Sequence, residues 1–251
     1  MPVPPPGRPR RLVTALVLVV AIGATATACS DPQVRAAVSD AASAQAPTRA
    51  VGSLAAGFHA TDLDSFYSGQ VVQPDPETWT DVRPSARYRV LVLADGRDES
   101  TARDPQVAIL VDAARRWARA EDRVDLTVRY LGDPHAYIDA IDGAAMSGTA
   151  DLIVTAGNGL VDPVAVVSAN YAGEHSQQFL VLGAEVAEPT TNIAASDWEG
   201  SAYLGEGVPE ASYYDPAAVT APRAYAALRA GVAAVLSGYR SIIVRIPADR
   251  Y

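Results

Sequence analysis

Residues 88–94 of this 251-residue chain read YRVLVLA, an almost unbroken apolar run with the length of one β-strand. Such a strand is typical of the interior of a parallel sheet, because helices cover both faces of that kind of sheet. Apolar residues then recur at positions 107, 110, 111, 114 and 117. This spacing predicts a helix over residues 107–120, so the two segments together predict the first β-α unit of an α/β fold.

The same alternation continues toward the C-terminus. Strands are predicted over residues 124–131, 151–156, 178–183, 192–196 and 241–246, and helices over residues 136–146, 164–171 and 221–237. Asp-Pro pairs at 104–105, 133–134 and 162–163 recur at equal intervals, and Asp followed by Pro is typical of a helix start. Coincidence is the alternative, because Asp-Pro also occurs at 31, 75 and 215. The alternation predicts a doubly wound, Rossmann-like parallel sheet.

The N-terminus has the pattern of a secretory signal. Arg8, Arg10 and Arg11 precede an apolar run over residues 12–28, which ends in Ala-Thr-Ala directly before Cys29. Cys29 is the only cysteine in the chain. We therefore expect cleavage before Cys29, acylation of its thiol, and a lipoprotein held at the extracytoplasmic face of the cell membrane. An uncleaved anchor is the alternative, because about 17 apolar residues are close to the lower limit for a membrane span.

Composition divides the chain into three expected parts. Residues 1–28 are the lipoprotein signal peptide, and residues 88–251 form the α/β lobe. Residues 29–87 are rich in Ala, Ser, Asp, Pro and Gln, a composition that buries too little apolar surface to offset the entropy of ordering. We expect this middle part to be an acylated N-terminus followed by a flexible tether and lead-in.

Charge and residue types exclude several function classes. The formal net charge is −9, and removal of the three arginines of the signal takes it to −12, so nucleic acid is a poor partner. All 20 basic residues are arginine, which is typical of GC-rich coding and of an actinobacterial source. One cysteine and three scattered histidines offer no metal site and no cofactor ligand set. Dinucleotide and nucleophile-elbow motifs are missing, so we expect no enzyme activity, although a hydrolase using Asp95, Asp98 and Glu99 is a less favoured alternative.

Candidate binding residues follow the predicted strands, because ligands of such sheets bind outside the carboxyl ends of the strands. Carboxylate and amide groups there suit ligand hydroxyls, and a tryptophan offers a stacking face. Each also has a purely structural explanation, since Asp caps helices and Trp fills space beside a sheet. The candidates are Asp95, Asn158, Asp197, Trp198 and Glu199.

Three stretches resemble the basic membrane protein family, the lipoproteins that serve as substrate-binding components of nucleoside ABC importers. They are residues 90–100 (VLVLADGRDES), 151–162 (DLIVTAGNGLVD) and 178–205, the last containing Glu199-Gly200 and Tyr203-Leu204-Gly205. The resemblance covers under half of the chain. It implies one lobe of a type I periplasmic-binding fold, a nucleoside-like ligand and an ABC permease as partner.

The chain departs from the family pattern at positions that matter for binding. Thr101-Ala102 stands where the family has a base-stacking phenylalanine, and Asn158 stands where a second is expected. The family closes two lobes around its ligand, whereas this chain ends at Tyr251, near the point where a second lobe is expected. We therefore expect weak or lost ligand binding. The alternative is an interaction or scaffold lipoprotein that keeps the fold without a small-molecule ligand.

Overall fold

The computed structural model describes residues 50–58, 68–98, 106–173, 177–201 and 214–251. Within the chain, Gln45–Tyr251 forms one compact unit. The predicted signal peptide and Cys29 lie outside the described residues. Thr101-Ala102 and Tyr203-Leu204-Gly205 lie outside them as well.

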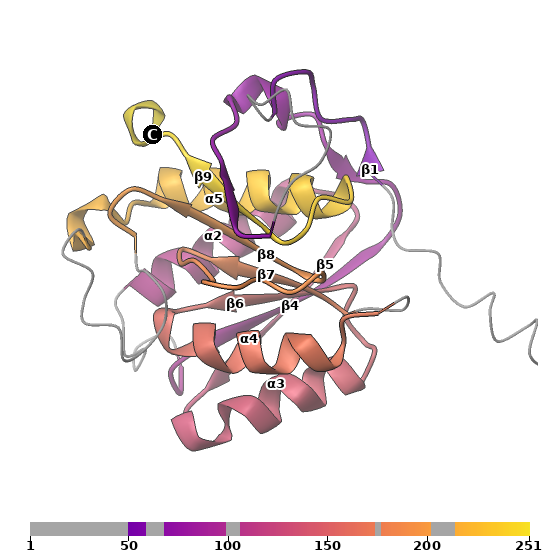
Figure 1. Ribbon diagram of the computed structural model, residues 1–251, viewed down its shortest axis with the longest axis vertical. Helices are drawn as coiled ribbons and strands as arrows, with labels where there is room; N and C mark the ends of the chain where they lie inside the picture. Colours follow the sequence, from indigo (N-terminus) through magenta and orange to yellow (C-terminus); the bar gives the residue numbers. More distant parts are fainter. Residues whose placement is uncertain (1–49, 59–67, 99–105, 174–176, 202–213) are drawn as a thin grey trace, which may run out of the picture. The chain divides into compact units, whose positions relative to one another are not determined.

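A seven-stranded sheet runs through the unit, and every neighbouring pair of its strands is parallel (Figure 1). In sheet order the strands are β2 (Gln70–Val72), β9 (Ile242–Ile246), β8 (Ile193–Trp198), β7 (Gln178–Leu182), β6 (Leu152–Ala156), β4 (Tyr88–Asp95) and β5 (Val124–Leu131). Two short strands, β1 (Ala50–Val51) and β3 (Arg83–Pro84), form a separate antiparallel pair.

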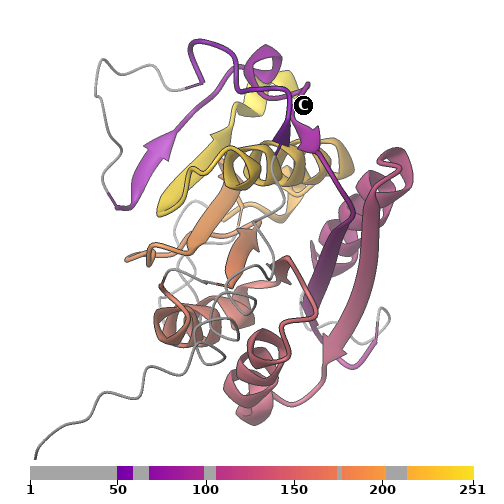
Figure 2. The same ribbon diagram turned by 90° about the vertical axis from the view of Figure 1, so that its right-hand side faces the viewer.

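Helices cover the two faces of the sheet in pairs (Figures 1 and 2). The α helices are α2 (Gln106–Ala120), α3 (Tyr137–Met146), α4 (Val161–Asn170) and α5 (Ala221–Leu236). Helices α2 and α5 pack on one face with one apolar core, and α3 and α4 pack on the other face with a second core. Short 3-10 turns are η1 (Pro76–Thr78), η3 (Pro134–Ala136), η4 (Asn158–Leu160), η5 (Pro216–Ala218) and η6 (Ala248–Arg250).

The predicted fold class is confirmed. Strands β4 to β9 and helices α2 to α5 fall within a few residues of the ranges expected from apolar periodicity. The five apolar positions that predicted α2 are all buried. Crossovers through helices on alternate faces produce the doubly wound parallel sheet that the sequence pattern indicates.

The Asp-Pro pairs mark helix starts at two of the three positions, and Asp is the cap at one of them. Asp133 accepts a hydrogen bond from the backbone N–H of His135 at 3.0 Å and caps η3, directly before α3. A helix also begins at Asp162-Pro163, but the capping role is wrong there, because Asp162 lies inside the first turn of α4 and Leu160 is the N-cap residue. Asp104-Pro105 lies outside the described residues.

The folded unit begins earlier than the expected boundary at residue 88. Strand β2 joins the main sheet beside β9, where Figure 2 also shows the two strands together. Phe58 and Trp79 are buried in the core that contains α5. The Phe58 ring stacks on Tyr239 with centroids 5.8 Å apart, and Arg229 Nη2 donates to the Thr80 carbonyl at 2.6 Å. Part of the expected tether therefore belongs to the folded unit, because its scattered apolar residues pack against residues in and around β9 and α5.

Candidate functional site

One row of residues crosses five neighbouring strands at the carboxyl edge of the sheet. The strand register aligns Ala94, Ala156, Leu182, Ser196 and Val244. One residue further toward the carboxyl ends, the row consists of Asp95, Gly157, Gly183, Asp197 and Arg245. Asp197 and Arg245 are paired in register and lie, like Asp95, on the face covered by α3 and α4. The two glycines turn away from that face, because a Cβ at Gly157 or Gly183 would contact α2. Charged side chains therefore stand at both ends of this edge, with two glycines between Asp95 and Asp197.

Asp95 is buried at the end of β4 and is 3% exposed. Its carboxylate accepts a hydrogen bond from the Tyr137 hydroxyl at the start of α3. Gly157 lies beside it, since a Cβ at position 157 would stand 2.9 Å from the Asp95 Cβ and 3.0 Å from Val107 Cγ2. Gly157 also has φ +116°, so it is the residue that permits the chain to turn closely against Asp95.

Asn158 follows Gly157 and begins the turn η4, where it is half-buried. The candidate residues Asp95 and Asn158 therefore lie at adjacent strand ends. Two residues before Gly157, Thr155 is buried on the same face as Asp95, and its hydroxyl has no hydrogen-bond partner among the described residues. Buried polar atoms of this kind are uncommon, because desolvation without a partner costs free energy.

At the other end of the row, Arg245 joins two buried carboxylates. Its Nε donates to Asp197 Oδ1 at 3.2 Å and its Nη2 to Asp197 Oδ2 at 2.9 Å. Nη2 also forms an ion pair with Glu185 Oε1, from the loop after β7. Asp197 is 2% and Glu185 5% exposed, whereas the Arg245 side chain is 29% exposed. The guanidinium is therefore the part of this cluster that reaches solvent.

Burial determines the protonation of this cluster. It raises the pKa of Asp197 to about 7, because the ionised form loses hydration. Burial also lowers the pKa of Arg245. The two hydrogen bonds from Arg245 act in the opposite direction on Asp197, since they favour its ionised form. Burial is the larger effect, so the pKa of Asp197 stays above its usual range.

Trp198 and Glu199 do not join the row. Trp198 is the last residue of β8 and is 1% exposed, packed in the core on the α2 and α5 face. In this structure its ring has no face open to a ligand. Glu199 follows in the turn after β8 and is exposed. Of the five predicted residues, Asp95, Asn158 and Asp197 therefore lie at the sheet edge in or beside the polar row, Glu199 lies in the next turn, and Trp198 is core.

Sequence reasoning missed Tyr137, Glu185 and Arg245 as members of the site. One signal for Arg245 was available: it is the single charge in the apolar strand IIVRI, and a charge in a buried strand usually has an opposite charge beside it. No comparable signal exists for Tyr137, because a tyrosine at a helix start is equally typical of core packing.

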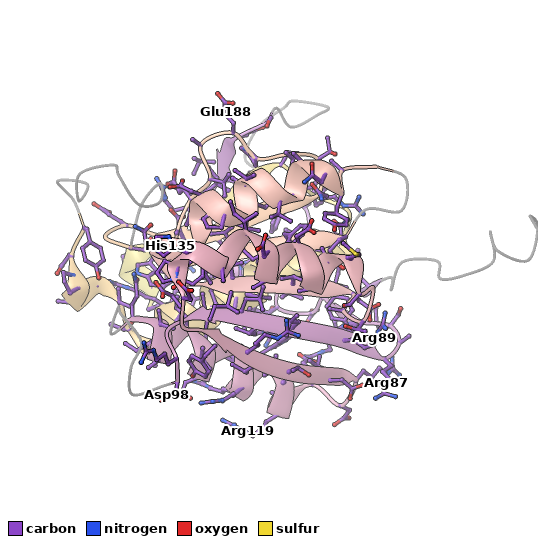
Figure 3. All side chains as sticks on the ribbon, turned by 90° about the horizontal axis from the view of Figure 1, so that it is seen from below. Arg87, Arg89, Asp98, Arg119, His135 and Glu188 are labelled. Atoms are coloured by element: carbon purple, nitrogen blue, oxygen red, sulfur yellow. The ribbon has the colours of Figure 1, made fainter. Side chains whose placement is uncertain are left out.

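The edge that carries the row also carries the loops after β4 and β5. Figure 3 shows Asp98 and His135 on this side of the molecule, and Arg87 and Arg89 on the opposite side, where β4 begins. Within the described ranges, no three His, Cys, Asp or Glu side chains are grouped so that they could hold a metal ion. Among the helices of those ranges, none has the length and apolar character of a membrane span.

Several solved structures are similar to part of this chain. An ABC transporter solute-binding protein from Aeropyrum pernix K1 is 25% identical, with 45% of this chain and 29% of that protein covered and a TM-score of 0.38. A solute-binding protein from Conexibacter woesei DSM 14684 is 23% identical, with 45% of this chain and 35% of that protein covered and a TM-score of 0.36. A periplasmic ribose ABC transporter protein from the same organism is 16% identical, with 65% and 55% covered and a TM-score of 0.35.

The matched region spans less than two thirds of each of these three proteins. No protein-family model matches the sequence, and no curated protein is significantly similar to it. Over part of its length, the chain is therefore similar to solute-binding proteins of ABC transporters.

Proposed function

We propose that this chain is a lipoprotein of the extracytoplasmic face of the membrane, anchored through Cys29. It binds a small hydroxylated, nucleoside-like ligand weakly at the carboxyl edge of the sheet, and it serves an ABC permease. The observation that supports the binding role is the polar row, which places Asp95 and Asp197 at the edge where ligands of parallel α/β sheets bind. Asn158 and Glu199 lie at the same strand ends. The proposed extracytoplasmic location rests on the signal-peptide pattern before Cys29.

We expect weak binding because the described residues can cover only part of the ligand surface. The described residues form one seven-stranded sheet with its helices and a small two-stranded pair, so these residues cover a ligand at the edge from one side. Tight small-molecule sites bury most of the ligand surface, commonly between two domains. The buried ring of Trp198 also offers no stacking surface.

Titration calorimetry with inosine and adenosine tests this function. We expect dissociation constants in the micromolar range or weaker, and a loss of about tenfold or more in affinity for Asp95→Asn, because one carboxylate acceptor is replaced. Asp249→Asn, an exposed change in η6, is the matched control and is expected to bind as the unaltered chain does. Nanomolar affinity, or no detectable binding at millimolar nucleoside, contradicts the proposal.

A scaffold lipoprotein without a ligand is the second candidate, and one observation favours it. The helices of the α3 and α4 face expose the large apolar side chains Ile138, Met146 and Val166. Exposed apolar side chains that gather on one surface often mark a protein interface. Light scattering on the intact chain and on Met146→Glu distinguishes the candidates: a dimer that the substitution dissociates, together with absent nucleoside binding, favours the scaffold.

A further inference from the structure

We infer that Arg245 contacts the ligand directly and makes the carboxyl edge select a neutral oxygen acceptor, a hydroxyl or carbonyl oxygen, over an anion. This inference rests on the proposed function and specifies the ligand class of that same site. Arg245 was not among the residues expected from the sequence to bind. Its unused donors, its fixed position and the charge around it support this role.

A guanidinium group has five N–H donors, one on Nε and two on each terminal nitrogen. Nε donates to Asp197, and Nη2 serves both Asp197 and Glu185. The two hydrogens of Nη1 have no acceptor among the described residues. Because 29% of the Arg245 side chain is exposed, the guanidinium reaches solvent with a pair of donors still available.

The position of these donors is fixed before any ligand arrives. Two hydrogen bonds to one carboxylate hold the guanidinium plane, and the ion pair with Glu185 holds it from a second strand end. A surface arginine loses much side-chain freedom when it binds a ligand, and that loss weakens binding. Arg245 has already lost this freedom on folding, so its Nη1 donors form a preorganised site.

The surrounding charge decides which acceptor fits. With both carboxylates ionised, the cluster of Glu185, Asp197 and Arg245 has a net charge of −1, and with one of them protonated it is neutral. Asp95 adds a further carboxylate to the same row. An anionic ligand at Nη1 would therefore meet a neutral or negative environment, where like charges oppose its binding. A hydroxyl or carbonyl oxygen accepts the same two hydrogen bonds without that repulsion.

The two glycines of the row complete the arrangement. Gly157 and Gly183 stand between Asp95 and Asp197 and contribute no side chain. Three strand spacings, about 14 Å, separate those two aspartates, and Arg245 lies one strand further, about 19 Å from Asp95. A ligand held by the Nη1 donors of Arg245 extends along this row toward Asp95. The site therefore suits a neutral molecule that presents a carbonyl or hydroxyl oxygen to Arg245 and hydroxyl groups toward Asp95.

The experiment uses inosine and inosine 5′-monophosphate as a matched neutral and anionic pair, with calorimetry on the full chain at pH 8. We expect inosine to bind at least about tenfold more tightly than its monophosphate. Arg245→Lys keeps the charge but removes the paired Nη1 donors, so it should weaken inosine binding by about tenfold or more. Arg250→Lys, at an exposed arginine of the same C-terminal region, is the control and should leave binding unchanged.

Arg245→Lys could fail to fold, since it disturbs two buried acids, and a measurement on the unaltered chain removes this dependence. In a protein with ¹⁵N-labelled arginine, the Arg245 side-chain resonances should shift when inosine is added. Equal or tighter binding of the monophosphate, unchanged inosine affinity in a folded Arg245→Lys protein, or unmoved Arg245 resonances each overturn the inference alone. If inosine does not bind at millimolar concentration, the proposed function fails and the inference fails with it.

Discussion

Gly231 lies where helix α5 packs closely against strands β7 and β8. A Cβ at this position would stand 2.8 Å from Ser196 Oγ and 2.9 Å from Leu180 Cδ1. We expect Gly231→Ala to lower the free energy of unfolding by about 1–3 kcal/mol, because overpacking outweighs the better helix propensity of alanine. Urea unfolding followed by circular dichroism measures the change.

Gly143→Ala in α3 is the matched control for that substitution. Nothing lies within 4 Å of a Cβ at position 143, so the change should raise the free energy of unfolding by about 0.5–1 kcal/mol through helix propensity alone. Equal effects at the two glycines would show that the close contact of α5 with β8 does not limit packing.

Asp197 gives a prediction for the pH dependence of stability. Burial raises its pKa in the folded chain to about 7, well above the value of an unfolded aspartate, so the folded state binds more protons between about pH 4 and pH 7. This group therefore makes stability fall as pH rises through that window. In the Asp197→Asn protein, the decrease in the free energy of unfolding over this pH window should be smaller by an amount on the order of 1–4 kcal/mol. Urea unfolding at pH 4.5, 6 and 8 measures it, and parallel profiles for the two proteins would contradict it.

Residue by residue, the sequence predicted part of the site. Asp95, Asn158 and Asp197 were recognisable because each follows an apolar strand of the expected sheet. Trp198 was expected to offer a stacking face after the end of the strand, but it belongs to the strand itself. The predicted strand ended at residue 196, whereas β8 continues to Trp198. In a strand, alternation then turns residue 198 into the core and residue 197 to the opposite face. Two further residues of strand thus decide which of the two side chains joins Arg245 and which packs in the core.

Among the elements, the lead-in offers the clearest test. Trp79 follows η1 and is 4% exposed in the core that contains α5. Trp79→Ala is expected to lower the free energy of unfolding by about 3–5 kcal/mol, as for large aromatic residues in other cores. Thermal unfolding measures it, with Val51→Ala at a half-exposed position of β1 as control, where the change should stay within about 0.5 kcal/mol. Similar small changes at both positions would mean that the lead-in contributes nothing to the fold.

Strand β2 shows why the lead-in was not predicted as structure. It has three residues, too few for a periodic pattern, and it pairs with β9 more than 160 residues later in the chain. Its stability depends on contacts with β9 that no local sequence window contains. The strands that were predicted differ, because β4 and β5 have eight residues each and carry their own apolar pattern.

At the scale of the whole molecule, we predict how the protein is attached to the membrane. If Cys29 is acylated as proposed, Cys29→Ser should abolish incorporation of radiolabelled palmitate and release the protein from the membrane fraction, because a serine hydroxyl does not take the thioether-linked lipid. Ser30→Ala is the neighbouring control and should leave labelling intact. Palmitate incorporation that persists in Cys29→Ser, or release of the unaltered chain, contradicts the anchor.

The short pair of strands β1 and β3 has a mechanical consequence for such an attachment. Two residue pairs, Ala50 with Pro84 and Val51 with Arg83, join β1 to β3. A pull on the chain from the N-terminal side acts first on this short pair. Beyond it, the hydrogen bond from the Ala55 N–H to the Thr78 carbonyl and the stacked rings of Phe58 and Tyr239 resist next. Tension would therefore peel the first strand away long before it disturbed the polar edge of the sheet.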